Sequence, residues 1–518
     1  MELTDVTLLL FATLISLIVY GLISLTSRFH YWKNKGIAYI RPLPLFGNFY
    51  PVYRYKISIG DVYIEAYLKF PNEKVVGIYE CVSPVLVVRD PEVVEKLLVK
   101  DFPHFTDHSQ FTESKGLLND ALFQLKGSTW RLVRNKISPA FTSGKLKGMF
   151  NDMVECSDEL IKLMDKNLNK DYEVRQALAA YMTNVIANTV FGIQISDKQA
   201  MDEFVRMSAS VFTASPAKFF EMVSLFLFPK LADRLGFSFM PDDISNYFKG
   251  LITNTLKQRE NGKFQRNDYT QQLLKLKQQG ALEVQSKAED EDLTVDSAAP
   301  SGHVEITDDL LAGQAFQFLS AGFDPLLVTT LWAMYDLALY PEIQEHARIH
   351  VQEVLEKHNG YSYASISDMT YLDQCMQGSS ASPNLKNTSI ITFLMRDCTK
   401  NYYISEANLE VKKGQKVVIP IGALQMDPKY YPDPEVYNPE RFPPNVTKQN
   451  FTYLPFGDGP RFCIGIRYAM IVMKLGLAKL LTKYKFKLSP KTELPIELNK
   501  QSILQVPKKS IYFNFTAI

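Results

Sequence analysis

The stretch F-G-D-G-P-R-F-C-I-G, residues 456–465, runs directly into a mostly apolar segment from Ile466 to Leu481. Its glycines allow φ > 0 and close approach of the backbone, so the loop can fold around a sulfur atom and direct amide hydrogens toward it. The apolar segment predicts a buried helix, which places Cys463 at a helix N-terminus, two residues from Arg461. Positive potential at that position favours a thiolate.

A lone thiolate limits the kind of metal site that this loop can form. Zinc needs three or four protein ligands at short spacings. A macrocycle that brings four nitrogens needs only one strong protein ligand, and in heme held by cysteine the thiolate favours O–O cleavage. A buried structural cysteine is the alternative. The cysteines are scattered, with no C-x-x-C pair, at Cys81, Cys156, Cys375, Cys398 and Cys463.

The loop contains a complete family motif, F-x-x-G-x-R-x-C-x-G. Its specified positions are Phe456, Gly459, Arg461, Cys463 and Gly465. The motif resembles the heme-binding signature of the cytochrome P450 family, and the resemblance extends from about Pro42 to the C-terminus. It implies heme b as cofactor, Cys463 as the axial ligand of the iron, and a mainly α-helical fold with small β-sheets.

Composition sets broad limits on the class of protein. The chain has 518 residues, of which 46% are hydrophobic, so it can bury a large core in one domain or two. A formal net charge of +1 argues against a nucleic-acid-binding protein. Five cysteines without a pairing pattern fit a reducing compartment.

The N-terminus predicts a transmembrane helix. The stretch from Val6 to Thr26 is uncharged and mostly apolar, and its length suits a helix that crosses a bilayer. Basic residues follow it, beginning with Arg28 and Lys33, so the positive-inside rule places the main domain on the cytosolic side. A cleaved signal peptide is the alternative, but the stretch lacks a basic n-region.

A proline-rich link follows the predicted anchor. The segment R-P-L-P-L-F-G-N at 41–48 cannot be helical. It resembles the hinge that precedes the catalytic domain in microsomal members of the family. We therefore expect a membrane anchor at 1–27, a basic, proline-rich hinge at 28–50 and a heme-binding catalytic domain at 51–518, in the endoplasmic reticulum membrane with the catalytic domain cytosolic.

Other predicted heme contacts are basic or aromatic. Trp130 and Arg134 lie four residues apart, on one face of a predicted helix. The pair resembles the family's heme-propionate helix, which implies that Arg134 pairs with a carboxylate and that Trp130 packs beside it. Arg396 and Arg461 match two further propionate-contacting arginines. A surface arginine over a core tryptophan is the alternative for the first pair.

One long central helix is predicted from its termini and its composition. Thr307 can cap it, Asp308 and Asp309 favour its positive end, and Pro341 marks its stop. Residues from Leu310 to Phe323 are apolar or neutral all round, so we expect the helix to be central.

This helix carries the sequence A-G-F-D-P. The family's oxygen-binding segment is A-G-x-[DE]-T, in which the acid and the alcohol relay protons to O₂. The resemblance implies that Ala321, Gly322 and Asp324 are the catalytic residues, with Asp324 feeding protons. Pro325 stands in place of the alcohol and adds its own kink, while Thr329 lies about one turn further on. Efficient coupling of electrons to product is thereby put in question.

A second departure concerns the Glu-x-x-Arg helix of the family, whose ion pair locks onto the arginine of a P-E-R-F turn. That turn is present, with Arg441, but no glutamate occurs between Lys357 and Ser405. Residues 377–389 make a poor helix. Arg441 would lose both partners, and breaking such a buried pair typically costs about 3–5 kcal/mol. A local gene-model or splicing fault, or a tolerated divergence, would explain this segment.

The resemblance implies a microsomal monooxygenase of the insect detoxification type. It would insert one oxygen atom of O₂ into a lipophilic small molecule, with electrons from an NADPH-dependent reductase and cytochrome b5 as a further donor. The alternatives are a heme-thiolate isomerase or dehydratase that does not use O₂, and a poorly folded, inactive product. A basic stripe could face the reductase or only solvent, at Lys136, Lys145 and Lys147.

Overall fold

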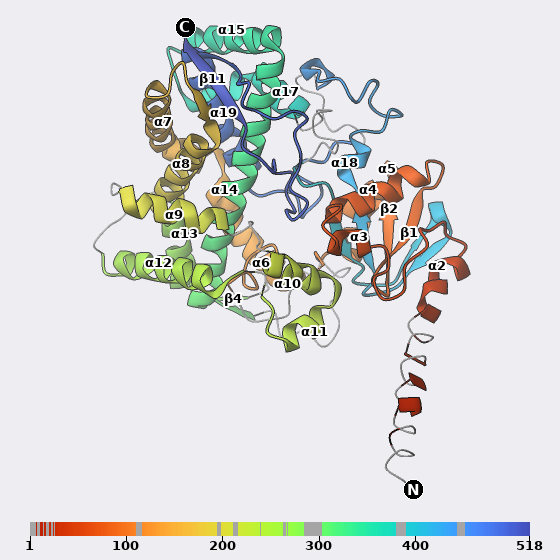
Figure 1. The fold of residues 1–518 in the computed structure, drawn as a ribbon. Helices are drawn as coiled ribbons and strands as arrows, with labels where there is room; N and C mark the ends of the chain where they lie inside the picture. The colour runs from red at the N-terminus through yellow and green to blue at the C-terminus, as the bar shows by residue number, and fades with distance from the viewer. Residues whose placement is uncertain are drawn as a thin grey trace.

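The structure is a computed structural model in which helices predominate and small sheets lie at the periphery (Figure 1). This confirms the predicted mainly α-helical fold with a small β component. The described residues are 7, 11–13, 15–16, 20–21, 24, 26–109, 117–193, 198–210, 216–238, 240–262, 266, 268–283, 303–379, 390–442 and 451–518.

The larger part of the molecule is a helical body organised around α14, Asp308–Leu339, which contacts α8, α12, α17 and α19. Two prolines of the middle region begin helices, where the missing N–H costs nothing. The other helices of the body are α6 Gly127–Ile137, α7 Ser143–Asp165, α8 Val174–Ile186, α9 Lys198–Ser210, α10 Pro216–Leu227, α11 Pro229–Arg234, α12 Asp242–Glu260, α13 Tyr269–Gln278, α15 Pro341–Lys357, α16 Tyr363–Asp368, α17 Thr370–Ser379 and α19 Ile466–Lys483.

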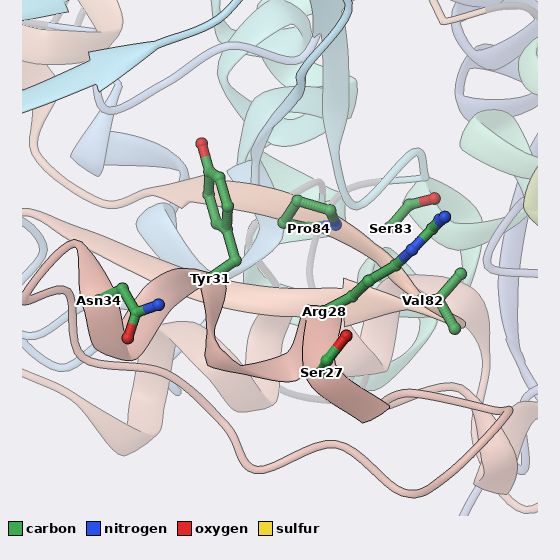
Figure 2. Close-up of a pocket in the computed structure, with 7 residues that line it drawn as sticks. All are labelled: Ser27, Arg28, Tyr31, Asn34, Val82, Ser83 and Pro84. Carbon is green, nitrogen blue, oxygen red and sulfur yellow. The ribbon is translucent and has the colours of Figure 1, made fainter. Parts of the chain in front are cut away.

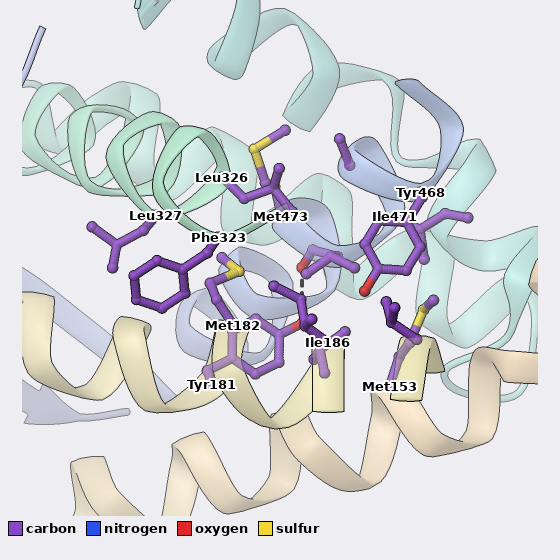
Figure 3. Packing of buried hydrophobic residues seen from close by; sticks show 14 of the residues in the cluster. Met153, Tyr181, Met182, Ile186, Phe323, Leu326, Leu327, Tyr468, Ile471 and Met473 are labelled. Carbon is purple, nitrogen blue, oxygen red and sulfur yellow. Dashed lines mark hydrogen bonds between the residues drawn. The ribbon is translucent and has the colours of Figure 1, made fainter. Parts of the chain in front are cut away.

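The termini of α14 form as the sequence predicts. The Thr307 side chain accepts a hydrogen bond of 3.1 Å from the amide of Leu310, and α15 begins at Pro341. Because α14 is apolar around its circumference, other elements cover nearly all of it. Figure 3 shows its residues interlocked with those of α7, α8 and α19, including the 2.8 Å hydrogen bond from the Tyr181 hydroxyl to the carbonyl of Val472.

A four-stranded sheet forms the core of the smaller part, in the order β1-β2-β9-β6 (Figure 1). Strands β1 and β2 are rich in β-branched residues and form an antiparallel hairpin. Strand β9 is parallel to β2 and antiparallel to β6. The bounds are β1 Val75–Glu80, β2 Ser83–Val88, β6 Leu394–Asp397 and β9 Lys416–Ile419, with α2 Tyr31–Asn34, α3 Tyr50–Tyr53, α4 Ile59–Lys69, α5 Pro91–Glu95 and α18 Ile421–Leu424 nearby.

Short strands and turns complete the structure. Three small sheets have the orders β10-β11-β3, β4-β5 and β7-β8. Their strands are β3 Asp171–Glu173, β4 Ala281–Glu283, β5 His303–Glu305, β7 Tyr402–Ile404, β8 Leu409–Val411, β10 Tyr484–Leu488 and β11 Tyr512–Ala517. The short 3₁₀ and π segments are Arg28–His30, Lys96–Lys100, Phe102–His104, Ser138–Phe141, Ala187–Phe191, Ser405–Ala407 and Pro439–Arg441.

The segment predicted as a hinge packs on the sheet. Trp32 is fully buried, and its indole donates a 2.9 Å hydrogen bond to the carbonyl of Ile78. A Cβ on Gly77 would lie 2.3 Å from the Trp32 ring, so only glycine allows this contact. Much of the predicted anchor, Val6 to Thr26, lies outside the described residues. Within the described part of the chain, no helix combines the length and apolarity needed to cross a membrane.

The segment that replaces Glu-x-x-Arg begins as helix. Helix α17 continues to Ser379, so residues 377–379 of the segment expected to be a poor helix are helical, and residues 380–389 lie outside the described part of the chain. Its last turn packs on Tyr437, whose hydroxyl donates a 3.1 Å hydrogen bond to the carbonyl of Cys375. A Cβ on Gly378 would lie 3.0 Å from the Tyr437 ring. The Tyr437 ring therefore fills the space beside the last turn of α17.

Arg441 of the P-E-R-F turn, for which the sequence offers no Glu-x-x-Arg partners, bonds to backbone oxygens instead. Its guanidinium donates to the carbonyls of Asp433 at 2.7 Å and Val436 at 3.0 Å. The Arg441 side chain is only partly buried, and backbone oxygens can accept from a guanidinium as a carboxylate does. A separate ion pair joins α17 to α19, because Nζ of Lys474 lies 2.9 Å from a carboxylate oxygen of Asp373.

Candidate active site

The loop before α19 is held in one conformation by its glycines. Gly457 and Gly459 have φ of +69° and +70°. A Cβ on Gly459 would lie 1.8 Å from the carbonyl oxygen of Leu98, so a larger residue cannot occupy this position. The amide of Cys463 donates a 2.9 Å hydrogen bond to the carbonyl of Phe456, which closes the loop. The positive φ allowed by the glycines is therefore used at Gly457 and Gly459, whereas Gly465 has a φ of −90°.

The polypeptide alone does not favour the Cys463 thiolate. Burial raises the pKa of Cys463, while the amide of Gly465 and the guanidinium of Arg134 act in the opposite direction. The expectation of a thiolate set by the helix N-terminus and by Arg461 is therefore corrected: desolvation dominates, and Arg134 is the cation that acts. A coordinated metal ion deprotonates such a thiol outright.

Arg461 is engaged with the polypeptide. Its guanidinium lies 4.0 Å from the centre of the Trp130 ring and donates 2.8 Å hydrogen bonds to the carbonyls of Thr106 and Leu125. The carboxylate of Asp107 lies 3.5 Å away. Burial lowers the pKa of Arg461 to about 9. Sequence reasoning missed Asp107, because nothing in its local pattern indicates a partner so distant in the chain.

Trp130 and Arg134 both lie on α6, and both contact the Cys463 loop. Trp130 is buried and meets Arg461, while Arg134 donates a 2.8 Å hydrogen bond to the carbonyl of Phe462, next to Cys463. Burial lowers the pKa of Arg134, and the nearby sulfur opposes that shift. The tryptophan thus positions one cation of the site, and α6 itself supplies another.

Arg396 is buried, and its guanidinium is only partly hydrogen-bonded by the described residues. It is only 3% exposed on β6, and one terminal nitrogen donates to the carbonyl of Met395 at 2.8 Å. Its Nε has no partner among the described residues. Burial lowers the pKa of Arg396 to about 10. A buried guanidinium with a free N–H donor is strongly stabilised by an anionic acceptor.

These arginines form one electrostatic cluster. Arg396 and Arg134 each act to lower the pKa of Arg461, and all three lower the pKa of His108, which burial already depresses. The His108 ring stacks on Phe123 at 4.1 Å, and its Nδ1 lies 3.1 Å from the Phe123 carbonyl. Like charges packed this closely are stable when anions join them. The heme group carries two carboxylates, so this cluster fits it, and sequence reasoning had not identified His108.

One face of α14 is left open. From Leu310 to Ala338 the helix is buried except for residues spaced three or four apart, which share a face. We call these residues the open stripe: Gln317, Phe318, Ala321, Pro325 and Thr329. Phe318 stacks on Phe141 at 5.1 Å, and a Cβ on Gly465 would lie 4.0 Å from Phe141. The stripe therefore begins next to the Cys463 loop.

The three predicted catalytic residues differ in their surroundings. Ala321 is exposed on the open stripe, whereas Gly322 is buried, and a Cβ there would lie 3.5 Å from Ile186 on α8. Asp324 is 4% exposed, and burial raises its pKa to about 7, with Arg175 of α8 opposing the shift. The structure thus places one of the three on the open face and surrounds the other two with protein.

A sequence model described as Cytochrome P450 matches residues 38–515 of the chain. The chain belongs to the cytochrome P450 family.

Individual relatives from insects cover nearly the whole chain. Cytochrome P450 6k1 of Blattella germanica is 33% identical over 97% of this chain and 96% of its own length. Probable cytochrome P450 6a14 of Drosophila melanogaster is 32% identical over 93% and 94%, respectively. Cytochrome P450 6B1 of Papilio polyxenes is 31% identical over 94% and 95%. The predicted membership and its likeness to insect members are confirmed.

Membership in the cytochrome P450 family settles the class of chemistry. The protein is a heme-thiolate monooxygenase that acts on small molecules, with heme b as its cofactor, O₂ as co-substrate and a reductase as redox partner. Of the functions considered from the sequence, the monooxygenase is the one that the relatives support. The P450 character of the chain also makes Pro325 its main chemical departure, because the alcohol of the family motif is missing there.

Proposed function

We propose that Cys463 is the axial ligand of heme b and that residues 456–465 form the wall behind the sulfur. The glycine-dependent loop and the amide of Gly465, which donates to the sulfur, support this role. When bound, the heme supplies the activation of O₂. The protein's part on this side is to hold the sulfur in place, to limit its contact with water and to surround it with donors.

The carboxylates of the heme would be held by Arg134, Arg396 and Arg461, with Trp130 orienting Arg461. The observation that carries this proposal is the unpartnered Nε of buried Arg396 beside two further guanidiniums. A carboxylate would accept from Arg396 and remove the repulsion within the cluster. Phe456, Gly459 and Gly465 would serve as backbone and packing contacts of the same group.

The open stripe of α14 would face the side where O₂ and substrate react. Ala321 would line this space, Gly322 would keep α14 close to α8, and Asp324 would deliver protons. A pKa of about 7 for Asp324 suits a group that both takes up and releases protons at neutral pH. The substrate would be a lipophilic small molecule, because α14 offers it mainly apolar side chains.

Electrons would come from an NADPH-dependent reductase, with cytochrome b5 as a second donor. The surface that docks the reductase would include the basic stripe on α6 and α7, where Lys136 and Lys147 are exposed and Lys145 is partly exposed. Lys136 shares α6 with Arg134, which donates to the carbonyl of Phe462 beside Cys463. Cationic groups at this face would steer an acidic partner.

Residues 1–27 would anchor the protein in the endoplasmic reticulum membrane, with 28–50 as the link and 51–518 as the cytosolic catalytic domain. The described start of the link is basic, with Arg28 and Lys33 exposed. Figure 2 shows Arg28 reaching toward the β1–β2 turn across a surface cavity between the link and the sheet. Asn514 heads a glycosylation sequon on β11, and we expect it to be unmodified. A mobility shift after glycosidase treatment would contradict this orientation.

The test of the site is carbon monoxide difference spectroscopy on the reduced, purified protein. The native protein should show the spectrum of thiolate-ligated heme. Cys463→Ser should lose that spectrum while its far-ultraviolet circular dichroism stays unchanged, because the serine oxygen is a much poorer ligand. An identical spectrum in the two proteins would rule out Cys463 as the ligand.

A further inference from the structure

Two glutamines of α14 hold the loop that carries Phe123. Gln314 is 2% exposed, its side-chain carbonyl accepts a 3.1 Å hydrogen bond from the amide of Leu122, and its amino group donates to the carbonyl of Asp120. Gln317 follows three residues later, so it lies on the same side of the helix. Its side-chain carbonyl accepts a 2.8 Å hydrogen bond from the amide of Phe123. The helix therefore fixes the backbone of this loop.

The two glutamines differ in their amino groups. In Gln314 both ends of the side-chain amide are bonded to the loop. Gln317 is partly exposed on the open stripe, and its amino group has no hydrogen bond among the described residues. A backbone N–H can only donate, so its bond to Gln317 fixes which end of this amide is the oxygen. The Gln317 amino group is thus a donor of fixed identity that is left for water or a ligand.

Phe123 is a second restrained group beside the open stripe. Its carbonyl oxygen lies 3.1 Å from Nδ1 of His108, and the centres of the two rings are 4.1 Å apart. The Phe123 side chain nevertheless remains 41% exposed. Because its backbone and ring are already held in place, little conformational entropy is lost when an apolar ligand packs on it. Phe123 therefore offers a preformed apolar contact, attached through its own amide to Gln317.

The open stripe connects this pair to the reacting side of the helix. Gln317 and Ala321 are four residues apart, on one face of α14, and Ala321 is exposed. The proposed function places Ala321 beside the space in which O₂ and substrate react. One helical turn rises about 5.4 Å, so one small molecule can contact both residues.

We propose that Gln317 selects lipophilic substrates that carry a carbonyl oxygen. The inference rests on the proposed function of this site and names the substrate class. The Gln317 amino group would donate to that oxygen, while the Phe123 ring would pack on the apolar part of the molecule. A hydrocarbon of the same shape would displace water from the amino group without replacing its hydrogen bond, which costs free energy. A site with such a donor therefore discriminates against molecules that lack the acceptor.

The test uses two probes of nearly identical shape, 9-fluorenone and fluorene, of which only the first has a carbonyl. Their dissociation constants are measured on the heme-loaded protein from the change in heme absorbance, and the ratio of the two constants is compared between variants. Gln317→Leu should reduce the preference for 9-fluorenone about tenfold, because one hydrogen bond is lost. Gln317→Glu keeps an oxygen for the Phe123 amide but removes the donor, and should also reduce it.

Gln314→Leu is the matched control, because it loosens the same loop without changing a residue of the open stripe. It should alter the two dissociation constants alike and leave their ratio at the native value. A native ratio in either Gln317 variant, an equal fall of the ratio in Gln314→Leu, or no binding of 9-fluorenone to the native protein would overturn the proposal. Since only heme-loaded molecules give the absorbance change, a partly unfolded variant still yields its ratio.

Carbon monoxide difference spectra separate this inference from the proposed function. We expect the thiolate spectrum in the native protein and in the three variants, because the changed side chains bond to the Phe123 loop. An intact spectrum with the same probe ratio in all four proteins would refute recognition by Gln317 and leave the proposed function standing. Absence of that spectrum from the native protein would overturn both.

Discussion

The ion pair between Asp373 and Lys474 should carry much of the attachment of α17 to α19. Lys474 is 3% exposed, and its ammonium lies 2.9 Å from the Asp373 carboxylate. Burial lowers the pKa of Lys474 and raises that of Asp373, so each ion depends on the other to remain charged. Because this chain lacks the family's Glu-x-x-Arg pair, we expect the Asp373–Lys474 ion pair to contribute strongly to the stability of this part of the fold.

Asp373→Asn tests this expectation. It keeps the shape of the side chain but leaves Lys474 as a buried cation without a counter-charge, which should cost about 3 kcal/mol of unfolding free energy. That is a large part of a total of about 5–15 kcal/mol for a typical protein. The measurement is urea-induced unfolding of the heme-loaded protein at pH 7, followed by both circular dichroism and heme absorbance.

A second ion pair on α19 provides the matched control. Lys479 lies near Asp158, whose side chain is 50% exposed to solvent. Asp158→Asn should cost less than about 1 kcal/mol, because exposed pairs contribute little. If Asp373→Asn lowered the unfolding free energy no more than Asp158→Asn does, the buried ion pair would not be the main contact that holds α17 in place. The packing of Tyr437 against α17 would then have to supply that stability.

Three further predictions concern the active site. Arg396→Gln should weaken heme binding about 10- to 100-fold, from the loss of about 1.5–3 kcal/mol of charge-assisted bonding. Without heme, the Arg396→Gln protein should melt no lower than the native apoprotein, because a buried cation has been removed. The control is Arg89→Gln, which removes the hydrogen bond from Arg89 Nε to the carbonyl of Tyr67. It should lower the melting temperature without changing the affinity for heme. Gly459→Ala should yield protein with little bound heme, measured by the ratio of heme to protein absorbance, because the new Cβ would lie 1.8 Å from the Leu98 carbonyl. Turnover should decline as pH rises through about 7, because Asp324 then loses the proton it delivers, and a pH profile unchanged in Asp324→Asn would contradict this.

The Cys463 loop and α14 could be predicted because their signals are local. Glycines at fixed offsets specify the turn, and a threonine followed by two aspartates specifies the start of α14. The same reasoning failed for the pKa of Cys463, because the dominant contribution is desolvation by residues distant in sequence. The helix N-terminus and a nearby arginine were visible in the sequence, whereas the extent of burial was not.

Arginine partners were the least predictable part of the site. The sequence indicated which arginines belong near the heme, but not that Arg461 would donate to the carbonyls of Thr106 and Leu125 while Arg396 kept an unpartnered Nε. The same limit applies to Arg441, which donates to the carbonyls of Asp433 and Val436. Backbone oxygens carry no residue identity, so a side-chain motif cannot reveal bonds made to them.

The two departures from the family pattern therefore have different consequences. Around α17 the missing pair is offset by contacts that hold the same elements together: the Tyr437 hydroxyl on the Cys375 carbonyl, backbone oxygens on Arg441, and the ion pair of Lys474. Those contacts join α17 to neighbouring segments, and none of them involves a residue of the open stripe. Pro325 instead alters the open stripe itself, where it removes an alcohol and frees a carbonyl. Substitutions around α17 should accordingly lower the free energy of unfolding while the fraction of electrons that reaches product stays the same. Substitutions at position 325 should change that fraction even when they raise the melting temperature.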